Sequence, residues 1–471
     1  MSAASPILST SQRYRSEFGE GMHDEIVGAL YEEASRIASR AVWQEGAERK
    51  LRWDQWLDKV LTSRIWGFPA MALLFGAVFW VTITGANVPS SLLGDLLMGT
   101  VYGWLHQGAN ALHAPEWLSG FLIDGVYLAM AWVVSVMLPP MAIFFPVFTL
   151  LEDLGYLPRV AFNLDRAFKG AGAHGKQALS MMMGFGCNAA GVVSTRIIDS
   201  PRERLIAILT NNFSICNGRW PTLILMATIF VAATMPPAFA SAVAAATVVG
   251  IAALGVIFTL LTSKLLSKTL LKGESSVFTL ELPPYRPPRV LQTLYTSLID
   301  RTLLVLWRAV VMAAPAGAVI WLISNVSVAG NSIAHWMVSG LEPLGVWVGL
   351  NGVILVAYIV AIPANEIIIP TILMLTLNLA KSSLASQGVM LELEESDIKG
   401  VLTGLGGWTA LTGINLMLFS LLHNPCSTTL LTIFKETGSK KWTLISALLP
   451  LVIGFAVCFL TASVARLLGW A

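Results

Sequence analysis

The residues best suited to chemistry lie in one apolar stretch, between residues 182 and 223. Thiols, side-chain amides and an arginine next to a glycine lie among its glycine and proline residues: Cys187, Asn188, Asn211, Asn212, Cys216, Asn217 and Arg219. A bilayer offers no water to backbone groups that glycine and proline leave free, so broken helices survive there only against protein or a wet cavity. Discontinuous helices with polar ligands commonly form the midplane ion sites of transporters. The stretch therefore predicts an ion site at membrane depth.

A second set of candidates lies in the later part of the chain, in two motifs that echo the first stretch. The motif PANE at residues 363–366 opens an apolar run as residues 187–188 do, and HNPC at 423–426 echoes FSIC at 213–216. Internal repeats of this kind place a binding site at their mutual interface. The echo adds three candidates to the site: Asn365, Glu366 and Cys426.

These residue types suit a borderline divalent cation. Thiolates bind such a cation tightly and selectively, whereas carboxylate and amide oxygens suit harder ions. A conducting path needs ligands that strip water from the ion and then release it. An isolated carboxylate inside the membrane, as at Glu366, is costly and indicates function. Structural roles stay open, since Glu366 could pair with Arg219 and the cysteines could be small buried hydrophobes; Cys458, without polar neighbours, is expected to pack in the core or against lipid.

The composition is that of an integral membrane protein. Hydrophobic residues make up 55% of the chain and charged residues 12%, against roughly 25% charged residues in a soluble domain, which excludes a soluble enzyme. The net charge of +2 is scattered and indicates no nucleic-acid partner. Residues 170–176 fit the spacing of a phosphate loop but lack the following Ser or Thr that would hold magnesium, so we expect no nucleotide site.

The apolar runs predict an all-α polytopic membrane protein with broken helices. A full span needs about 20 apolar residues, and the runs give about nine to eleven membrane segments, several of them half-length. The first is expected at residues 66–84, followed by a connection over 85–120, and Pro139-Pro140 should kink or divide another span. The basic segment 264–308 is predicted to be cytoplasmic, like the polar N-terminal residues 1–65.

Three runs of sequence resemble the membrane part of the ferrous iron transport protein B (FeoB) family. They are LLEDLGYLPRVAFNLDRAFKGAGAHGKQALSMMMGFGCN, then ELPPYRPPRV at 281–290, and NPCSTTLLTIFKETGSKKW at 424–442. The resemblance implies a multi-pass importer of Fe(II) in the bacterial inner membrane, with a cytoplasmic N-terminus, two "Gate" repeats and no bound cofactor. The path cysteines that it implies are Cys187, Cys216 and Cys426.

The resemblance also implies a division of the chain. Residues 1–65 match the family's helical spacer, 66–263 the first Gate half, 264–308 a cytoplasmic connector and 309–471 the second Gate half. Family members commonly begin with a GTPase domain that this sequence does not show, so a separate GTPase chain and a small Feo-type accessory protein are the expected partners beside the bilayer. A homo-oligomer stays open.

One departure from the family pattern leaves other functions open. The motif after the first cysteine often reads CNVPA in the family, whereas residues 187–191 read CNAAG here. The alternatives are a Gate-type carrier of another divalent metal or of a nucleoside-like solute, and a membrane partner that does not transport.

Overall fold

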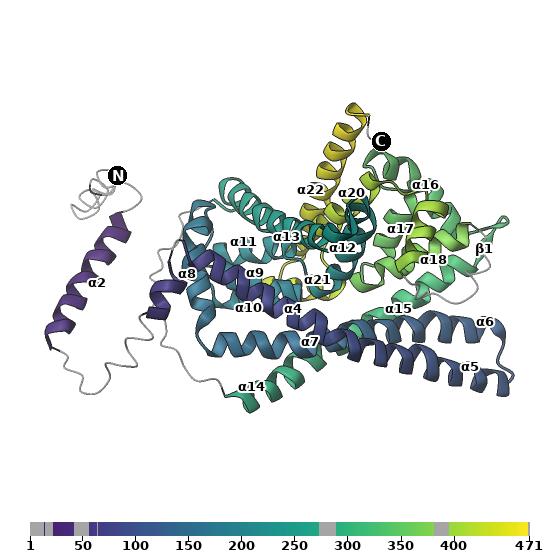
Figure 1. Ribbon diagram of the computed structural model, residues 1–471, viewed down its shortest axis with the longest axis horizontal. Helices are drawn as coiled ribbons and strands as arrows, with labels where there is room; N and C mark the ends of the chain where they lie inside the picture. Colours follow the sequence, from purple (N-terminus) through teal and green to yellow (C-terminus); the bar gives the residue numbers. More distant parts are fainter. Residues whose placement is uncertain are drawn as a thin grey trace, which may run out of the picture.

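The chain folds almost entirely into helices, as the sequence predicts. The computed structural model describes residues 14, 22–41, 56–63, 65–272, 289–380 and 395–469. Within these residues the only sheet pairs two short antiparallel strands, β1 (Ser327–Val328) and β2 (Asn331–Ser332). The N-terminal arm predicted over residues 1–65 contains one long described helix, α2 (Met22–Ala41). Figure 1 shows the helical bundle and the position of α2.

Six helical segments of the described chain are long and apolar enough to cross a membrane, or seven if one bent pair counts as a span. They are Gly67–Ala111, Glu116–Asp153, Ala242–Lys268, Val305–Asn325, Ala410–Thr437 and Lys440–Leu467. The bent pair joins α16 (Ile333–Trp347) to α17 (Gly352–Val360) at 113°. Two shorter apolar helices are also present. Asn365–Leu379 agrees with the half-length segments that the sequence predicted, whereas Val290–Ile299 lies in the segment 264–308 that was predicted to be a cytoplasmic connector.

The first two spans form a long helical hairpin that includes most of the connection expected over residues 85–120. Helix α4 (Gly67–Gly94) continues through η2 (Asp95–Val101) into α5 (Tyr102–Ala111), and the chain returns through α6 (Glu116–Ser119) and η3 (Gly120–Tyr127). The Tyr102 hydroxyl donates to Asp124 Oδ1 at 2.7 Å and the Tyr127 hydroxyl to the Leu97 carbonyl at 2.8 Å. These bonds join the two arms, so the expected connection is helical up to Ala111.

Helix α7 (Leu128–Asp153) runs as one helix through Pro139, Pro140 and Pro146, so the proline pair does not divide this span. It packs against both α4 and α15 (Leu304–Asn325). Neighbouring helices make prolines tolerable in a membrane helix because they and local adjustments satisfy the freed backbone groups. The division of this span that the sequence allowed does not occur.

The remaining helices range from three-residue turns to the 32-residue helix α13. In the first half they are α8 (Tyr156–Gly170), α9 (Gln177–Gly186), α10 (Asn188–Ser194), η4 (Thr195–Ile197), α11 (Pro201–Thr210), η5 (Asn211–Phe213), η6 (Asn217–Arg219), α12 (Trp220–Met226), η7 (Ala227–Val231), η8 (Ala232–Thr234) and α13 (Pro237–Lys268). In the second half they are α14 (Val290–Thr296), η9 (Ser297–Leu303), η10 (Asn365–Ile367), α18 (Ile368–Leu379), α19 (Glu395–Gly400), η12 (Val401–Leu405), α20 (Ala410–Leu422), α21 (Ser427–Thr437) and α22 (Lys440–Leu467).

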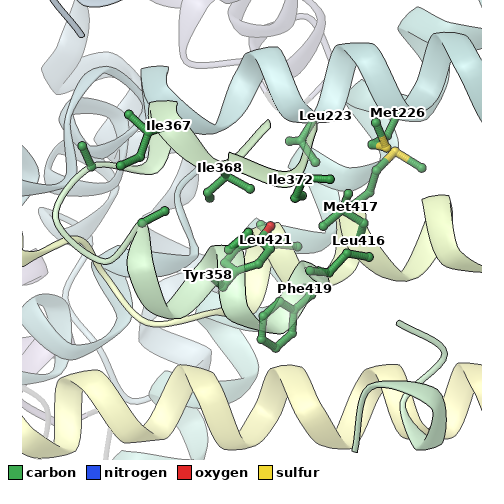
Figure 2. Packing of buried hydrophobic residues seen from close by; sticks show 14 of the residues in the cluster. Leu223, Met226, Tyr358, Ile367, Ile368, Ile372, Leu416, Met417, Phe419 and Leu421 are labelled. Atoms are coloured by element: carbon green, nitrogen blue, oxygen red, sulfur yellow. The ribbon is translucent and has the colours of Figure 1, made fainter. Parts of the chain in front are cut away.

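The hydrophobic core joins the two halves. Figure 2 shows Leu223 and Met226 of α12 packed with Ile372 of α18 and with Leu416 and Met417 of α20. All five side chains are at most 1% exposed. Burying a large aliphatic side chain contributes about 1.5–3 kcal/mol, so this contact holds the short helices of both halves in fixed positions around their breaks.

Candidate functional site

Each predicted site cysteine has an extended backbone conformation and lies between two helical segments. Cys187 separates α9 from α10 with φ −153° and ψ 124°, and Ala364 precedes η10 with nearly the same angles, −150° and 118°. Cys216 precedes η6 at −75° and 164°, and Cys426 precedes α21 at −62° and 159°. The two halves thus repeat the same pair of breaks, in the order that the sequence echo predicted.

The four breaks meet in the interior of the protein. The Ser427 backbone amide, next to Cys426, donates to the Ile362 carbonyl at 2.9 Å. The Asn212 side chain donates to the His423 carbonyl at 2.6 Å. A Cβ on Gly218 would stand 2.1 Å from Glu366 Oε1, so the Glu366 carboxylate lies directly on the backbone beside Cys216. The expected convergence of the breaks from both halves is confirmed.

Arg219 is fully buried and ties these breaks together. Its Nη1 donates to the carbonyls of Asn212 at 2.9 Å and Leu421 at 3.1 Å, and its Nη2 donates to Asn212 Oδ1 at 3.0 Å. Nη2 also donates to the carbonyls of His423 at 3.5 Å and Asn424 at 3.4 Å, in the break between α20 and α21. Among the ion pairs of the described residues, none joins Arg219 to Glu366. The guanidinium therefore caps carbonyls and does not form the ion pair with Glu366 that the sequence left open.

The site asparagines link the breaks to one another. The Asn211 side chain donates to the Asn188 carbonyl at 2.8 Å. The Asn188 amide reaches the carbonyls of Gly184 at 3.0 Å and Ser214 at 3.1 Å when its nitrogen faces them. Asn365 Nδ2 lies 3.8 Å from Cys216 Sγ. A buried amide needs such partners because an unpaired polar group there costs about 1–3 kcal/mol, so these side chains also fix the backbone around the thiols.

Asn217 lines a small cavity beside the first two breaks. Gly186, Phe144 and Trp220 are among its other walls, and its volume is about 20 Å³. About 10–15 Å³ of such volume holds one water molecule, so the cavity has room for one small, water-sized particle.

The thiols and the carboxylate lie at the same breaks without forming a closed metal cluster. Asn365 lies against Cys216, the Glu366 carboxylate lies against Gly218, and the amide next to Cys426 bonds to Ile362. Within the described part of the chain, no three His, Cys, Asp or Glu side chains are close enough together to hold a metal ion. Cys458 lies elsewhere, with its Sγ 3.5 Å from the Asn415 carbonyl.

Three further residues at the breaks escaped the sequence reasoning: His423, Tyr358 and Trp132. His423 is buried, and its Nε2 lies 3.3 Å from Asn365 Oδ1. The Tyr358 ring packs edge-on against it with centroids 4.7 Å apart. Trp132 Nε1 donates to the Glu366 carbonyl at 3.3 Å. Only His423 had a signal, since an ionisable residue in an apolar run indicates function by default.

Charged side chains surround the loop between α10 and α11, outside the spans. Lys176 Nζ lies 2.9 Å from Asp199 Oδ2, and this hydrogen bond holds the pKa of the Asp199 carboxyl below its ordinary value. Burial lowers the pKa of His174 in the loop before α9. The Glu436 carboxylate, near the end of α21, forms ion pairs with Arg196 Nη2 at 2.6 Å and with Arg204 Nη2 at 2.8 Å. These pairs connect the second half, through α21, to the first.

The fold and the site together define an all-α, multi-pass membrane protein built around discontinuous helices. A Gate family model described as "Nucleoside recognition" matches residues 134–230 and 306–440, and a model for the "Ferrous iron transport protein B C terminus" matches 248–300. The chain belongs to the FeoB family and corresponds to its membrane region. No solved structure matches the chain.

Curated relatives cover most of the chain. The "Fe(2+) transporter FeoB" of Staphylococcus aureus (strain MSSA476) is 29% identical over 431 residues, which are 89% of this chain and 60% of the relative. That of Campylobacter jejuni is 25% identical over 455 residues, 92% of this chain and 68% of the relative. An "Fe(2+) transport protein A/Fe(2+) transporter FeoB fusion protein" of Porphyromonas gingivalis is 26% identical over 446 residues, which are 86% of this chain and 50% of the relative. The chain thus spans about 60% of the length of the first of these relatives.

Proposed function

We propose that this chain carries Fe(II) across the bacterial inner membrane, along a path between its two halves. The observation that supports this most is the meeting of the four breaks, where Cys187, Cys216, Cys426 and Glu366 lie. The names of the relatives, Fe(2+) transporters, favour iron as the substrate.

The ligand types suit transfer better than storage. Thiolates of the cysteines would replace water around a borderline ion, and the Glu366 carboxylate with neighbouring amides would pass it on, because a path must bind its ion well enough to admit it and weakly enough to release it. The lack of a closed cluster among the described side chains agrees with a path in which the ion meets few ligands at a time.

A nucleoside-like solute is the second candidate, because the matching Gate model carries the description "Nucleoside recognition". The cavity at the breaks, beside Asn217, is too small to hold such a solute. At about 20 Å³ it admits a particle the size of one water molecule, whereas pockets for drug-sized ligands hold roughly 300–1,000 Å³. Another divalent metal would pass the same ligands and stays an alternative substrate.

We further propose that a separate GTPase and a small Feo-type protein act on the chain from the cytoplasmic side, where the N-terminal arm would lie. The fusion of a transport protein A to its relative in Porphyromonas gingivalis supports the accessory partner. Helix α2 leaves Ile26, Leu30 and Ile37 at 45%, 64% and 58% exposed, which favours it as the surface where a GTPase docks.

The test is uptake of radioactive Fe(II), under reducing conditions, in bacteria that lack their own ferrous importer. Cells that express the chain should take up more Fe(II) than empty-vector cells, and co-expression of a GTPase domain should raise the rate. Unlabelled Mn(II) and Zn(II) as competitors identify the preferred metal, and labelled uridine tests the alternative. Uridine uptake without Fe(II) uptake, with or without the GTPase, would refute the proposal.

A further inference from the structure

We propose that His423 is a nitrogen ligand for the transported cation, acting with Cys216 at the point where the two halves meet. This inference rests on the proposed function and adds to its thiol and carboxylate contacts an imidazole that neither the sequence motifs nor the relatives' names assign. Asn365 lies between the imidazole and the thiol, and its side chain would move away when the ion binds there.

The surroundings of His423 fix which ring nitrogen is free. Nδ1 lies 3.0 Å from the Ser420 carbonyl oxygen, which can only accept a hydrogen bond, so Nδ1 carries a proton. A second proton on Nε2 would add a positive charge close to the buried guanidinium of Arg219, whose Nη2 already reaches the His423 carbonyl. Such an unpaired buried charge is costly. The neutral ring therefore exposes a lone pair at Nε2.

The ring is also held in place. Tyr358 packs edge-on against it at 4.7 Å between centroids, and Phe419 lies over it with an interplanar angle of 29° at 6.2 Å. A metal-binding histidine usually donates its second ring nitrogen to a carbonyl or carboxylate, which fixes the tautomer and raises the basicity of the ligand. The bond from Nδ1 to Ser420 supplies that feature before any ion arrives.

Asn365 fills the gap between the two ligands. Its Oδ1 lies 3.3 Å from His423 Nε2, and its Nδ2 lies 3.8 Å from Cys216 Sγ. Because an unprotonated Nε2 can only accept a hydrogen bond, the amide must turn its nitrogen towards the ring and its oxygen towards the thiol, the reverse of this orientation. An ion that binds Nε2 and Sγ at about 2.0–2.3 Å must displace this amide, so Asn365 would hold the resting site closed and offer its oxygen once it turns.

The ligand set has a consequence for selectivity. Imidazole and thiolate ligands favour first-row transition metals, whereas Mg²⁺ and Ca²⁺ are bound by carboxylates, carbonyls and water. Cys216 and His423 together would thus admit Fe(II) and exclude the more abundant hard cations. Binding would release the thiol proton, because a cysteine ligand is deprotonated.

The test uses Co(II) as a spectroscopic probe on the purified full chain in detergent, without oxygen. The wild type should bind Co(II) with a sulfur-to-metal charge-transfer absorption, and X-ray absorption at the cobalt edge should show the outer-shell scattering of an imidazole. H423Q should lose the imidazole signal and weaken Co(II) binding about tenfold or more. H335Q, which changes a histidine of α16 outside the breaks, is the matched control and should behave as wild type.

The outcomes separate this inference from the function on which it rests. A wild type with the sulfur absorption but no imidazole scattering would overturn the role of His423 and leave the thiol path intact. A wild type without the sulfur absorption would overturn both. If H423Q elutes as an aggregate in size-exclusion chromatography, the wild-type X-ray spectrum alone decides.

Discussion

Replacement of Arg219 by methionine is the sharpest test of how the two halves are joined. The change keeps the length and apolar stem of the side chain and removes its donors. The carbonyls of Asn212 and Leu421 and the Asn212 side-chain oxygen then lose short hydrogen bonds of 2.9–3.1 Å, in a place with 0% exposure. We expect R219M to be much less stable than the wild type.

The size of the effect follows from those bonds. A hydrogen bond to a charged group contributes roughly 1.5–3 kcal/mol, so three of them contribute about 4–9 kcal/mol. The cost of burying the charge disappears with the guanidinium and offsets part of this sum. A net loss of about 3 kcal/mol or more is expected, and R219K should recover only part of it because an ammonium lacks the forked donor geometry.

The assay is thermal unfolding of the purified chain in mild detergent. R196M is the matched control because it makes the same substitution at an arginine that pairs with Glu436 and whose side chain is 64% exposed. We expect R196M to unfold close to the wild type and R219M far below it. Equal unfolding temperatures for the two variants would show that the buried guanidinium does not hold the breaks together.

Three further predictions concern the site and its surroundings. E366Q keeps the shape of Glu366 and removes its charge, so Fe(II) uptake should fall about tenfold or more at normal expression; wild-type uptake would return Glu366 to a structural role. G218A places a methyl group 2.1 Å from Glu366 Oε1 and should impair uptake, whereas G250A, with nothing within 4 Å, should not. The hydrogen bond from Lys176 lowers the pKa of Asp199 in the folded protein. The stability that this bond contributes is therefore present above the ordinary Asp pKa and is lost as the pH falls through the lowered pKa. Between pH 6 and pH 3 the unfolding temperature of the wild type should therefore fall more steeply than that of D199N, and parallel curves would contradict the shift.

The sequence was sufficient to predict the class of protein and the positions of the breaks. Glycine, proline and polar side chains cannot continue an apolar helix without an internal partner, and they mark the interruptions at Cys187, Cys216 and Cys426. The echo between residues 213–216 and 423–426 predicted their meeting, since related segments bind at a common interface. The matching backbone angles at Cys216 and Cys426 support that inference.

The sequence could not predict features that depend on which groups meet in space. The helix over residues 85–111 was missed because its bonds to the returning arm, such as Tyr102 to Asp124, join residues far apart in the chain. The partners of Arg219 are carbonyls, which every residue has, so no side-chain pattern reveals them. The free nitrogen of His423 follows only from its distance to the Ser420 carbonyl.

The central claim, that Fe(II) passes the thiols at the meeting of the breaks, is tested most directly by cysteine variants in the uptake assay. Serine replaces the sulfur by a poorer ligand of similar size, so C216S and C426S should each lose most Fe(II) uptake when co-expressed with the GTPase. C458S changes a thiol that bonds only within the packed core and should transport as the wild type does. Full uptake in the C216S and C426S double variant would contradict the claim.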